Sequence, residues 1–130
     1  MNINKSIKKW HEFIEGEDLS VLNELLAQDV VFHSPVLHTP QKGKILTKMY
    51  LSAAYYVFKD NDFVYTRQVI QGNQAVLEFE TVIDGIVING VDIIECNVEG
   101  KFIDFKVMIR PLKGLKLLQH KMFEMLEKAK

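Results

Sequence analysis

The sequence lacks the features that mark secreted, membrane-spanning and nucleic-acid-binding proteins. Cys96 is the only cysteine in 130 residues, so no internal disulfide can form and a reducing compartment is expected. No apolar run reaches the ~18 residues of a membrane span, and the residues after Met1 do not have the pattern of a signal peptide. The net charge of −1 and the absence of a basic cluster argue against nucleic acid as the main partner. We therefore expect a cytoplasmic protein that binds neither nucleic acid nor membrane.

The chain also lacks any sign of a second domain. No repeat, low-complexity segment or Pro/Gly-rich linker divides it. The hydrophobic fraction of 48% and the charged fraction of 25% are typical of a soluble globular protein. At this length the chain can bury a single core, so residues 1–130 are expected to form one domain.

The first half of the chain favours helices. Apolar residues in 3–15 recur at helical spacing, and Asp18 is a good N-cap for a second short helix. A short strand is expected at 30–33, before Ser34-Pro35, and a third helix at 43–59.

After residue 61 the apolar residues alternate with period two, which is typical of strands. Short connections that contain glycine separate the expected strands, so we predict an antiparallel meander. The four strands are expected at 63–71, 74–83, 86–97 and 101–110. A helix should follow Pro111. The predicted fold class is therefore α+β, with a curved antiparallel sheet wrapped over the N-terminal helices and a C-terminal helix.

Asp92 is the most informative single residue, because it interrupts the most apolar stretch of the chain. Alternate residues of a strand share a face, and every neighbour of Asp92 on its face is apolar: Ile86, Ile88, Gly90, Ile94 and Cys96. Burial of an unpaired charge is costly, so such a carboxyl group shifts its pKa and tends to be neutral. Two interpretations stay open: a structural acid bonded to a backbone group or hydroxyl, and a functional acid in a cavity.

The histidines, Ser34 and Cys96 give weaker indications of catalysis or metal binding than Asp92 does. Adjacent strand residues point in opposite directions, so His33 and Ser34 cannot easily form a catalytic triad with Asp92. A metal site from His33, His38 and Asp92 lacks any recognised ligand spacing, and we expect neither a metal nor another cofactor. Nothing basic adjoins Cys96, which indicates an inert buried thiol.

The order of elements, with the residues around Ser34 and Asp92, resembles the nuclear transport factor 2-like superfamily, in its SnoaL-like (polyketide-cyclase) and ketosteroid isomerase branches. The residues that carry this resemblance over nearly the whole chain are Trp10, Gly16-Glu17-Asp18-Leu19, Leu25-Leu26-Ala27-Gln28-Asp29-Val30, Ser34-Pro35-Val36, Gly43, Gly90-Val91-Asp92 and Val107. The resemblance implies a cone-shaped fold in which sheet and helices enclose a deep, mostly apolar pocket.

The resemblance also assigns positions to the isomerase machinery. The general-base aspartate of ketosteroid isomerases falls at Ser34, the oxyanion-hole tyrosine of the first helix at Trp10, and a supporting tyrosine at Leu51. Their protonated oxyanion-hole aspartic acid falls at Asp92 and is retained. Serine is not a useful base at neutral pH without a partner, so steroid isomerisation by the usual base is not expected.

Two functions follow as expectations. The first is binding of a small, largely apolar molecule in a deep pocket anchored by Asp92. The alternative is an isomerase, polyketide-cyclase-like or epoxide-hydrolase-like enzyme with Asp92 as the catalytic acid/base. The expected ligand-binding residues are Trp10, Phe13, His33, Ser34, His38, Leu51, Leu77, Phe79, Ile94, Phe105 and Val107.

The outer face of the sheet predicts an interaction with a second copy of the chain. Val91 and Ile93 are apolar and lie on the face opposite to Asp92. Apolar patches on exposed faces usually mark contacts, and the superfamily that the chain resembles commonly dimerises through its sheet. We therefore expect a homodimer.

Overall fold

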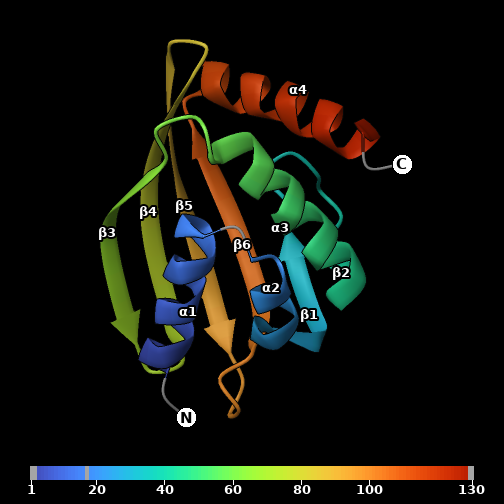
Figure 1. Cartoon of the computed structure of the whole chain (residues 1–130), viewed down its shortest axis with the longest axis vertical. Helices are drawn as coiled ribbons and strands as arrows, with labels where there is room; N and C mark the ends of the chain where they lie inside the picture. The colour runs from blue at the N-terminus through green and yellow to red at the C-terminus, as the bar shows by residue number, and fades with distance from the viewer. Residues whose placement is uncertain (1–2, 17, 129–130) are drawn as a thin grey trace.

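The computed structural model describes residues 3–16 and 18–128 and contains four helices and six strands in these residues (Figure 1). The elements are α1 (Ile3–Glu15), α2 (Ser20–Leu25), β1 (Leu26–His33), β2 (Gln41–Lys42), α3 (Lys44–Phe58), β3 (Val64–Gln71), β4 (Gln74–Ile83), β5 (Ile86–Cys96), β6 (Phe102–Arg110) and α4 (Leu112–Lys128). The predicted order of helices and strands is confirmed, with the two-residue β2 as an addition. No helix among the described residues is long and apolar enough to cross a membrane.

The six strands form one sheet in the order β2-β1-β6-β5-β4-β3. Strands β3 to β6 are the predicted antiparallel meander. Strand β1 pairs with β6 in parallel, so the sheet is mixed rather than wholly antiparallel. A parallel pair needs a long crossover between its strands, and here α3 and three strands of the meander separate β1 from β6. The α+β cone fold is otherwise as predicted.

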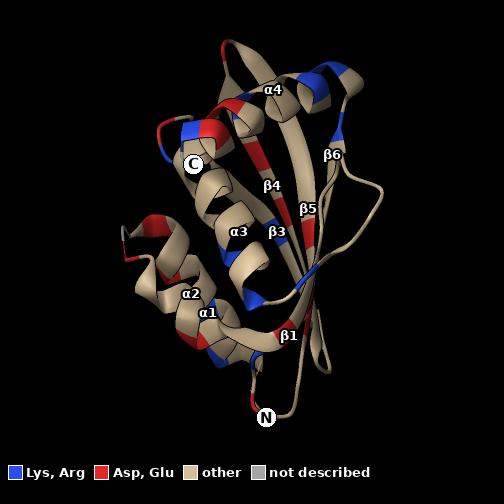
Figure 2. Ribbon diagram, turned by 90° about the vertical axis from the view of Figure 1, so that its right-hand side faces the viewer, with Lys and Arg blue, Asp and Glu red and all other residues tan. Residues whose placement is uncertain are grey.

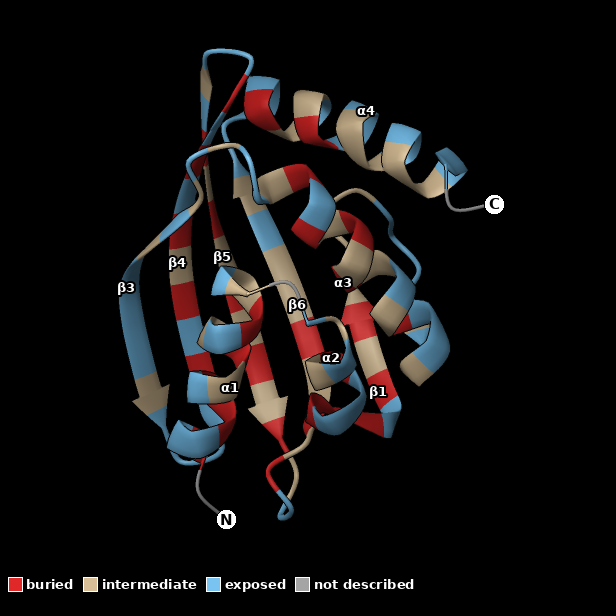
Figure 3. Cartoon of the chain, in the orientation of Figure 1, coloured by how far each residue is buried: buried red, intermediate tan, exposed pale blue. Residues whose placement is uncertain are grey.

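All four helices lie on one face of the sheet (Figures 1 and 2). The strand residues on that face are buried, as the alternating colours of β4 show in Figure 3. No helix covers the opposite face within the described residues (Figure 2). The helices therefore enclose the concave side of the sheet, onto which the predicted pocket should open.

A two-residue turn between β4 and β5 fixes the register that places Asp92. Asp84 and Gly85 both have positive φ, 52° and 77°, as the right-handed twist of a tight hairpin favours. The pairing that follows sets Leu77 opposite Asp92. Because paired residues share a face, the Asp92 side chain lies on the buried side, among the apolar residues that the period-two pattern indicated.

The start of α2 differs by one residue from the prediction. Leu19 occupies the N-cap position, and the carboxylate of Asp18 accepts a hydrogen bond from the Ser20 N–H at 3.0 Å. The hydrogen bonds from Ser20 lower the pKa of Asp18. Asp18 therefore satisfies one of the free N–H groups at the helix start, as a capping side chain does.

The core consists of two hydrophobic clusters. The larger one joins α1, α2 and α3 to the lower part of the sheet and includes Trp10, Phe13, Leu77 and Phe105. The smaller one lies under α4, and its buried members are Val57, Ile83, Ile88 and Leu118. The helix α4 is thus held to the sheet mainly through one buried leucine and its apolar neighbours.

Candidate functional site: an apolar pocket with a buried acid

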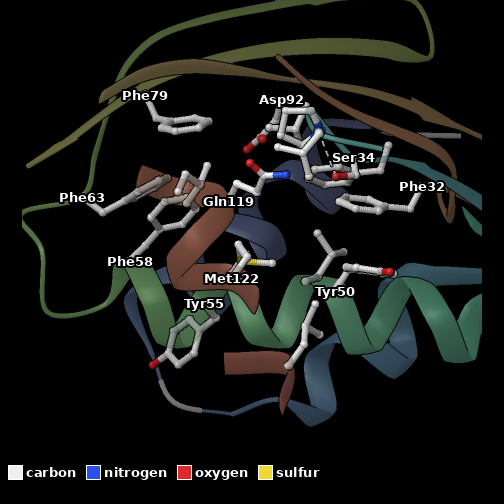
Figure 4. Close-up of a pocket in the computed structure, with 18 of the residues that line it drawn as sticks. Phe32, Ser34, Tyr50, Tyr55, Phe58, Phe63, Phe79, Asp92, Gln119 and Met122 are labelled. Atoms are coloured by element: carbon white, nitrogen blue, oxygen red, sulfur yellow. Dashed lines mark hydrogen bonds between the residues drawn. The ribbon is translucent and has the colours of Figure 1, made fainter. Parts of the chain in front are cut away.

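A cavity of about 290 Å³ lies between the concave face of the sheet and helices α1, α3 and α4 (Figure 4). This volume is at the lower end of the range of about 300–1,000 Å³ for small-molecule sites. Aromatic side chains form much of its wall, among them Phe32, Tyr50, Phe58, Phe63, Phe79 and Phe105. The ring centroids of Phe63 and Phe79 are 4.9 Å apart in a stacked arrangement. Such a wall favours a flat or cyclic apolar molecule.

Asp92 of β5 places a carboxyl group on this apolar wall. Its side chain is 5% exposed, and its neighbours across the sheet are Leu77 and Val107. Burial raises the pKa of Asp92 from 3.8 to about 7, against the opposing effect of a hydrogen bond from Tyr65. Near neutral pH both protonation states are therefore populated, so the group can donate a proton or accept one.

Tyr65 of β3 is the hydrogen-bond partner of Asp92. Its hydroxyl donates to Asp92 Oδ2 at 2.5 Å and accepts from Trp10 Nε1 at 2.8 Å. Burial raises the pKa of Tyr65 well above its usual value, and the charge of Asp92 adds to this effect. Tyr65 therefore stays protonated and links the first helix to the buried acid.

Tyr65 was not predicted from the sequence as a site residue. Period-two alternation puts Phe63 and Tyr65 on the same face of the chain, and both line the cavity. This shared face was the feature of the sequence that could have indicated Tyr65. It is weak because β3 is an edge strand with mostly exposed residues, so its inner face is not marked by a continuous apolar pattern.

The pocket-lining residues of α4 were missed as well. They are Leu118, Gln119, Met122, Phe123 and Leu126. They form one stripe at helical spacing, which the sequence displays. The direction in which a C-terminal helix packs is set by tertiary contacts, however, so the stripe alone does not indicate the pocket.

The structure brings most of the predicted ligand-binding residues to the cavity wall. Besides Asp92, these residues are Trp10, Ser34, Leu51, Phe79, Phe105 and Val107. The hydroxyl oxygen of Ser34 accepts a hydrogen bond from the Val36 N–H at 3.2 Å, and no basic side chain is bonded to Ser34 among the described residues. Ser34 therefore has no activating base.

Three predicted residues lie in the core behind the wall rather than on it. Leu77 and Ile94 are fully buried, because the large cluster under α1 covers their part of the inner sheet face. Phe13 packs on Trp10 and on Tyr55, with ring centroids 5.2 Å apart in each pair. None of these three predicted ligand-binding residues lines the cavity.

The two histidines are also separate from the pocket. Phe32 points inward from β1, so its neighbour His33 points to the other side. There His33 Nε2 lies 2.9 Å from Asp104 Oδ1. His38 is exposed in the loop that follows. Neither histidine lines the cavity, although both were predicted as ligand-binding residues.

Two other kinds of site considered from the sequence are a metal site and a reactive cysteine. Among them, no group of three or more His, Cys, Asp or Glu side chains could hold a metal ion. Cys96 is fully buried, and burial, with the nearby charge of Glu95, raises the pKa of its thiol to about 11. A thiol with such a pKa is a poor nucleophile.

Comparison with known families gives a match to the SnoaL-like domain over residues 7–105. The chain belongs to the SnoaL-like family. The matched segment of this SnoaL-like chain contains Trp10, Tyr65 and Asp92 and ends before α4 begins. No curated protein matches the chain in sequence.

Solved structures agree with this assignment. A steroid delta-isomerase from Pseudomonas aeruginosa is 36% identical, with 98% of this chain and 93% of that chain covered and a TM-score of 0.92. An uncharacterised bacterial protein with a cystatin-like fold from Silicibacter pomeroyi is 30% identical, with 92% and 83% covered and a TM-score of 0.84. A de novo designed protein with a curved β-sheet shares the fold at 15% identity, with 92% and 93% covered and a TM-score of 0.73.

Proposed function

We propose that this SnoaL-like protein binds a compact, largely apolar cyclic molecule that carries one hydrogen-bonding oxygen. The observation that carries the proposal is the single buried acid on an otherwise apolar wall: Asp92, bonded to Tyr65, in a cavity of about 290 Å³. Ligand sites typically combine an apolar lining with a few polar anchors. In this site the apolar wall holds the rings, and Asp92 holds the oxygen.

The protonation state of Asp92 decides which oxygen it binds. In its neutral form the carboxyl group donates to a carbonyl oxygen, and in its ionised form it accepts from a hydroxyl group. Because its pKa is about 7, both forms are present near neutral pH. Ketones and their enols are therefore the ligand class that fits the site in either state.

A matched pair of bicyclic compounds tests this proposal. Tetralin is a hydrocarbon, and β-tetralone has the same ring skeleton with one ketone oxygen. We expect the parent protein to bind β-tetralone more tightly than tetralin, and Asp92→Leu, whose side chain cannot form a hydrogen bond, to reduce this preference by about tenfold, the effect of one lost hydrogen bond to an ionisable group. Calorimetry and the fluorescence of Trp10, the only tryptophan, measure both affinities.

Asp60→Leu is the control, because Asp60 is an exposed aspartate that does not line the cavity. It should bind both compounds as the parent does. Failure of the parent to bind either compound would reject the proposal. Equal affinity for the two compounds in the parent would reject the role of Asp92 as an anchor.

A second candidate function is catalysis of enolisation, with Asp92 as acid/base. Two observations favour it: the pKa of Asp92 lies near neutral pH, where a proton-transfer group is most effective, and the chain is 36% identical to the steroid delta-isomerase. In this reaction the carboxylate of Asp92 removes a hydrogen from the carbon beside the ketone as a proton. An enolate and a neutral Asp92 carboxyl group then form, the carboxyl proton exchanges with solvent, and Asp92 returns a proton to the same carbon.

Exchange of the α-hydrogens of β-tetralone in deuterated water, followed by NMR, separates the two functions. An enzyme exchanges these hydrogens faster than buffer does, and Asp92→Asn loses the exchange while it retains the bound ketone. A binding protein leaves the exchange rate at the buffer value in both proteins. The result also tests whether Asp92 alone is sufficient where Ser34 stands in place of the usual base.

We also propose that two copies associate through the outer sheet face. Val69 and Val87 are each 55% exposed there and Met108 is 52% exposed. No helix covers this face within the described residues (Figure 2). Light scattering coupled to size exclusion at micromolar concentration tests the proposal, since a mass of 15.0 kDa would indicate a monomer and reject it.

A further inference from the structure

The polar end of the pocket uses most of its own hydrogen-bond donors internally. The Trp10 N–H is bonded to Tyr65, and the Tyr65 hydroxyl is bonded to Asp92 Oδ2. The Tyr55 hydroxyl donates to the carbonyl of Gly16. Neither Trp10 nor Tyr65 is therefore free to donate to a ligand that Asp92 binds. A ligand oxygen at Asp92 needs its second hydrogen bond from another side chain.

Gln119 of α4 can supply this bond. It lines the cavity and is exposed, and no hydrogen bond joins its amide to another described residue. In Figure 4 the side chain extends from α4 toward the end of the pocket where Asp92 lies. A free primary amide offers two donors and one acceptor.

The two wall hydroxyl groups of Ser34 and Tyr50 are less well placed to reach a ligand oxygen at Asp92. Ser34 and Tyr50 lie on the Phe32 side of the pocket in Figure 4. The Tyr50 ring stacks on Phe32 with centroids 5.5 Å apart, and the Ser34 hydroxyl oxygen accepts a hydrogen bond from the Val36 N–H, so both side chains are held on that side. Gln119 is the polar side chain that points toward Asp92.

We propose that Gln119 is a specificity-determining residue whose amide N–H donates to the same ligand oxygen that Asp92 binds. The arrangement works in either protonation state of Asp92. A carbonyl oxygen accepts from both Asp92 and Gln119, whereas a hydroxyl oxygen donates to the Asp92 carboxylate and accepts from Gln119. The pair selects oxygenated rings over hydrocarbons of the same shape.

Gln119 lies outside the part of the chain that matches the SnoaL-like domain. The match to the SnoaL-like domain ends at residue 105, and α4 begins at Leu112. The buried acid therefore lies inside the family segment, whereas its proposed partner lies outside it. A change of residue 119 would alter ligand preference without disturbing Asp92 or Tyr65.

This inference rests on the proposed binding function, and the variant Gln119→Met tests it separately. Methionine has a similar length and a good helix propensity but cannot donate a hydrogen bond. We expect Gln119→Met to weaken β-tetralone binding about threefold to tenfold, the range for one neutral hydrogen bond, and to leave tetralin binding unchanged. His120→Met is the control, because His120 is the next residue of α4, is exposed and does not line the cavity.

The possible outcomes separate the two proposals. If Gln119→Met binds β-tetralone as tightly as the parent, or weakens both compounds equally, the role of Gln119 is overturned while the Asp92 pocket stands. If the parent binds neither compound, the proposed function fails and this inference fails with it. Loss of β-tetralone affinity in Gln119→Met alone, with tetralin affinity and His120→Met unchanged, supports the inference.

Discussion

The sheet wall and the α4 wall of the pocket differ in burial and in chemistry, and only the sheet wall carries Asp92 inside the segment that matches the SnoaL-like domain. The sheet wall carries Asp92, which is buried, and its hydrogen-bond partner Tyr65, which is half-buried, inside the segment that matches the SnoaL-like domain. The α4 wall carries Gln119 and Phe123, which are exposed, and lies outside that segment. The sheet fixes the position of the acid, and under the proposed function α4 sets access to the pocket and ligand preference.

The two walls also differ in how they are held. Strand β5 is paired with β4 and β6 along its length, so Asp92 sits in a continuous hydrogen-bonded ladder. Helix α4 is held by the small cluster around Leu118. Cooperative units with few buried contacts open more easily than a central sheet. We therefore expect substitutions in the sheet wall to affect the whole fold and those in α4 to affect mainly the pocket mouth.

The largest expected effect comes from truncation of one buried leucine in each wall. Leu77→Ala removes a fully buried side chain from the large cluster and should lower the free energy of unfolding by about 3–5 kcal/mol. Leu118→Ala should cost nearer 2 kcal/mol, because α4 can shift to fill part of the cavity. Urea denaturation measures both, and an equal loss in the two variants would contradict the proposed difference between the walls.

The next effect is a pH dependence that originates in Asp92. Its pKa is raised on folding, so the folded state binds more protons than the unfolded state between the unfolded value of 3.8 and the folded value of about 7. The contribution of Asp92 to stability is therefore largest below this window and declines as the pH rises through it. Because one pKa unit corresponds to about 1.4 kcal/mol, the parent should lose roughly 3 kcal/mol between pH 5 and pH 8.

Asp92→Asn isolates this contribution, since asparagine does not titrate. The difference in unfolding free energy between the parent and the variant should change by this amount across the same pH range, while the titration of other groups cancels. Denaturation in urea at several pH values gives the difference directly. A difference that stays constant with pH would show that the buried carboxyl has an ordinary pKa.

A smaller effect is expected for Tyr65→Phe, which removes only a hydroxyl group. The variant leaves the carboxyl of Asp92 and the N–H of Trp10 without their partner, at a cost of about 1–3 kcal/mol. Because the bond from Tyr65 lowers the pKa of Asp92, the variant should shift the pH dependence described above to higher pH. Tyr56→Phe is a matched control, since Tyr56 is 42% exposed and does not line the cavity.

The sequence was sufficient to predict the fold and the buried acid, because both depend on local periodicity. Alternation in 86–97 and the Asp84-Gly85 turn set the register that places Asp92 on the inner face. The direction of β1 relative to β6 was not predictable in this way. Period two is the same for parallel and antiparallel pairs, so only the path of the chain decides that pairing.

The site was predicted less completely, because its residues come from elements that meet only in the folded chain. Tyr65 lies 27 positions from Asp92, and an edge strand gives little apolar pattern to mark its inner face. The resemblance placed Trp10 near the acid, and the structure shows that Tyr65 lies between them. His33 shows the converse, since it is next to Ser34 in sequence but does not line the cavity.

The smallest effect on stability is expected at the mouth of the pocket, where α4 presents an exposed aromatic ring. Phe123 is 63% exposed and still lines the cavity, so Phe123→Ala should change the free energy of unfolding by no more than about 0.5 kcal/mol. It should weaken the binding of tetralin and β-tetralone to a similar extent, by a few fold, because it removes apolar contact and not a hydrogen bond. Leu112→Ala is the control, since Leu112 is 66% exposed on the same helix and does not line the cavity. If both variants weakened binding equally, the effect would come from α4 as a whole. If only Phe123→Ala does so, the terminal helix contributes a specific wall to the pocket, which is the distinction drawn between α4 and the sheet.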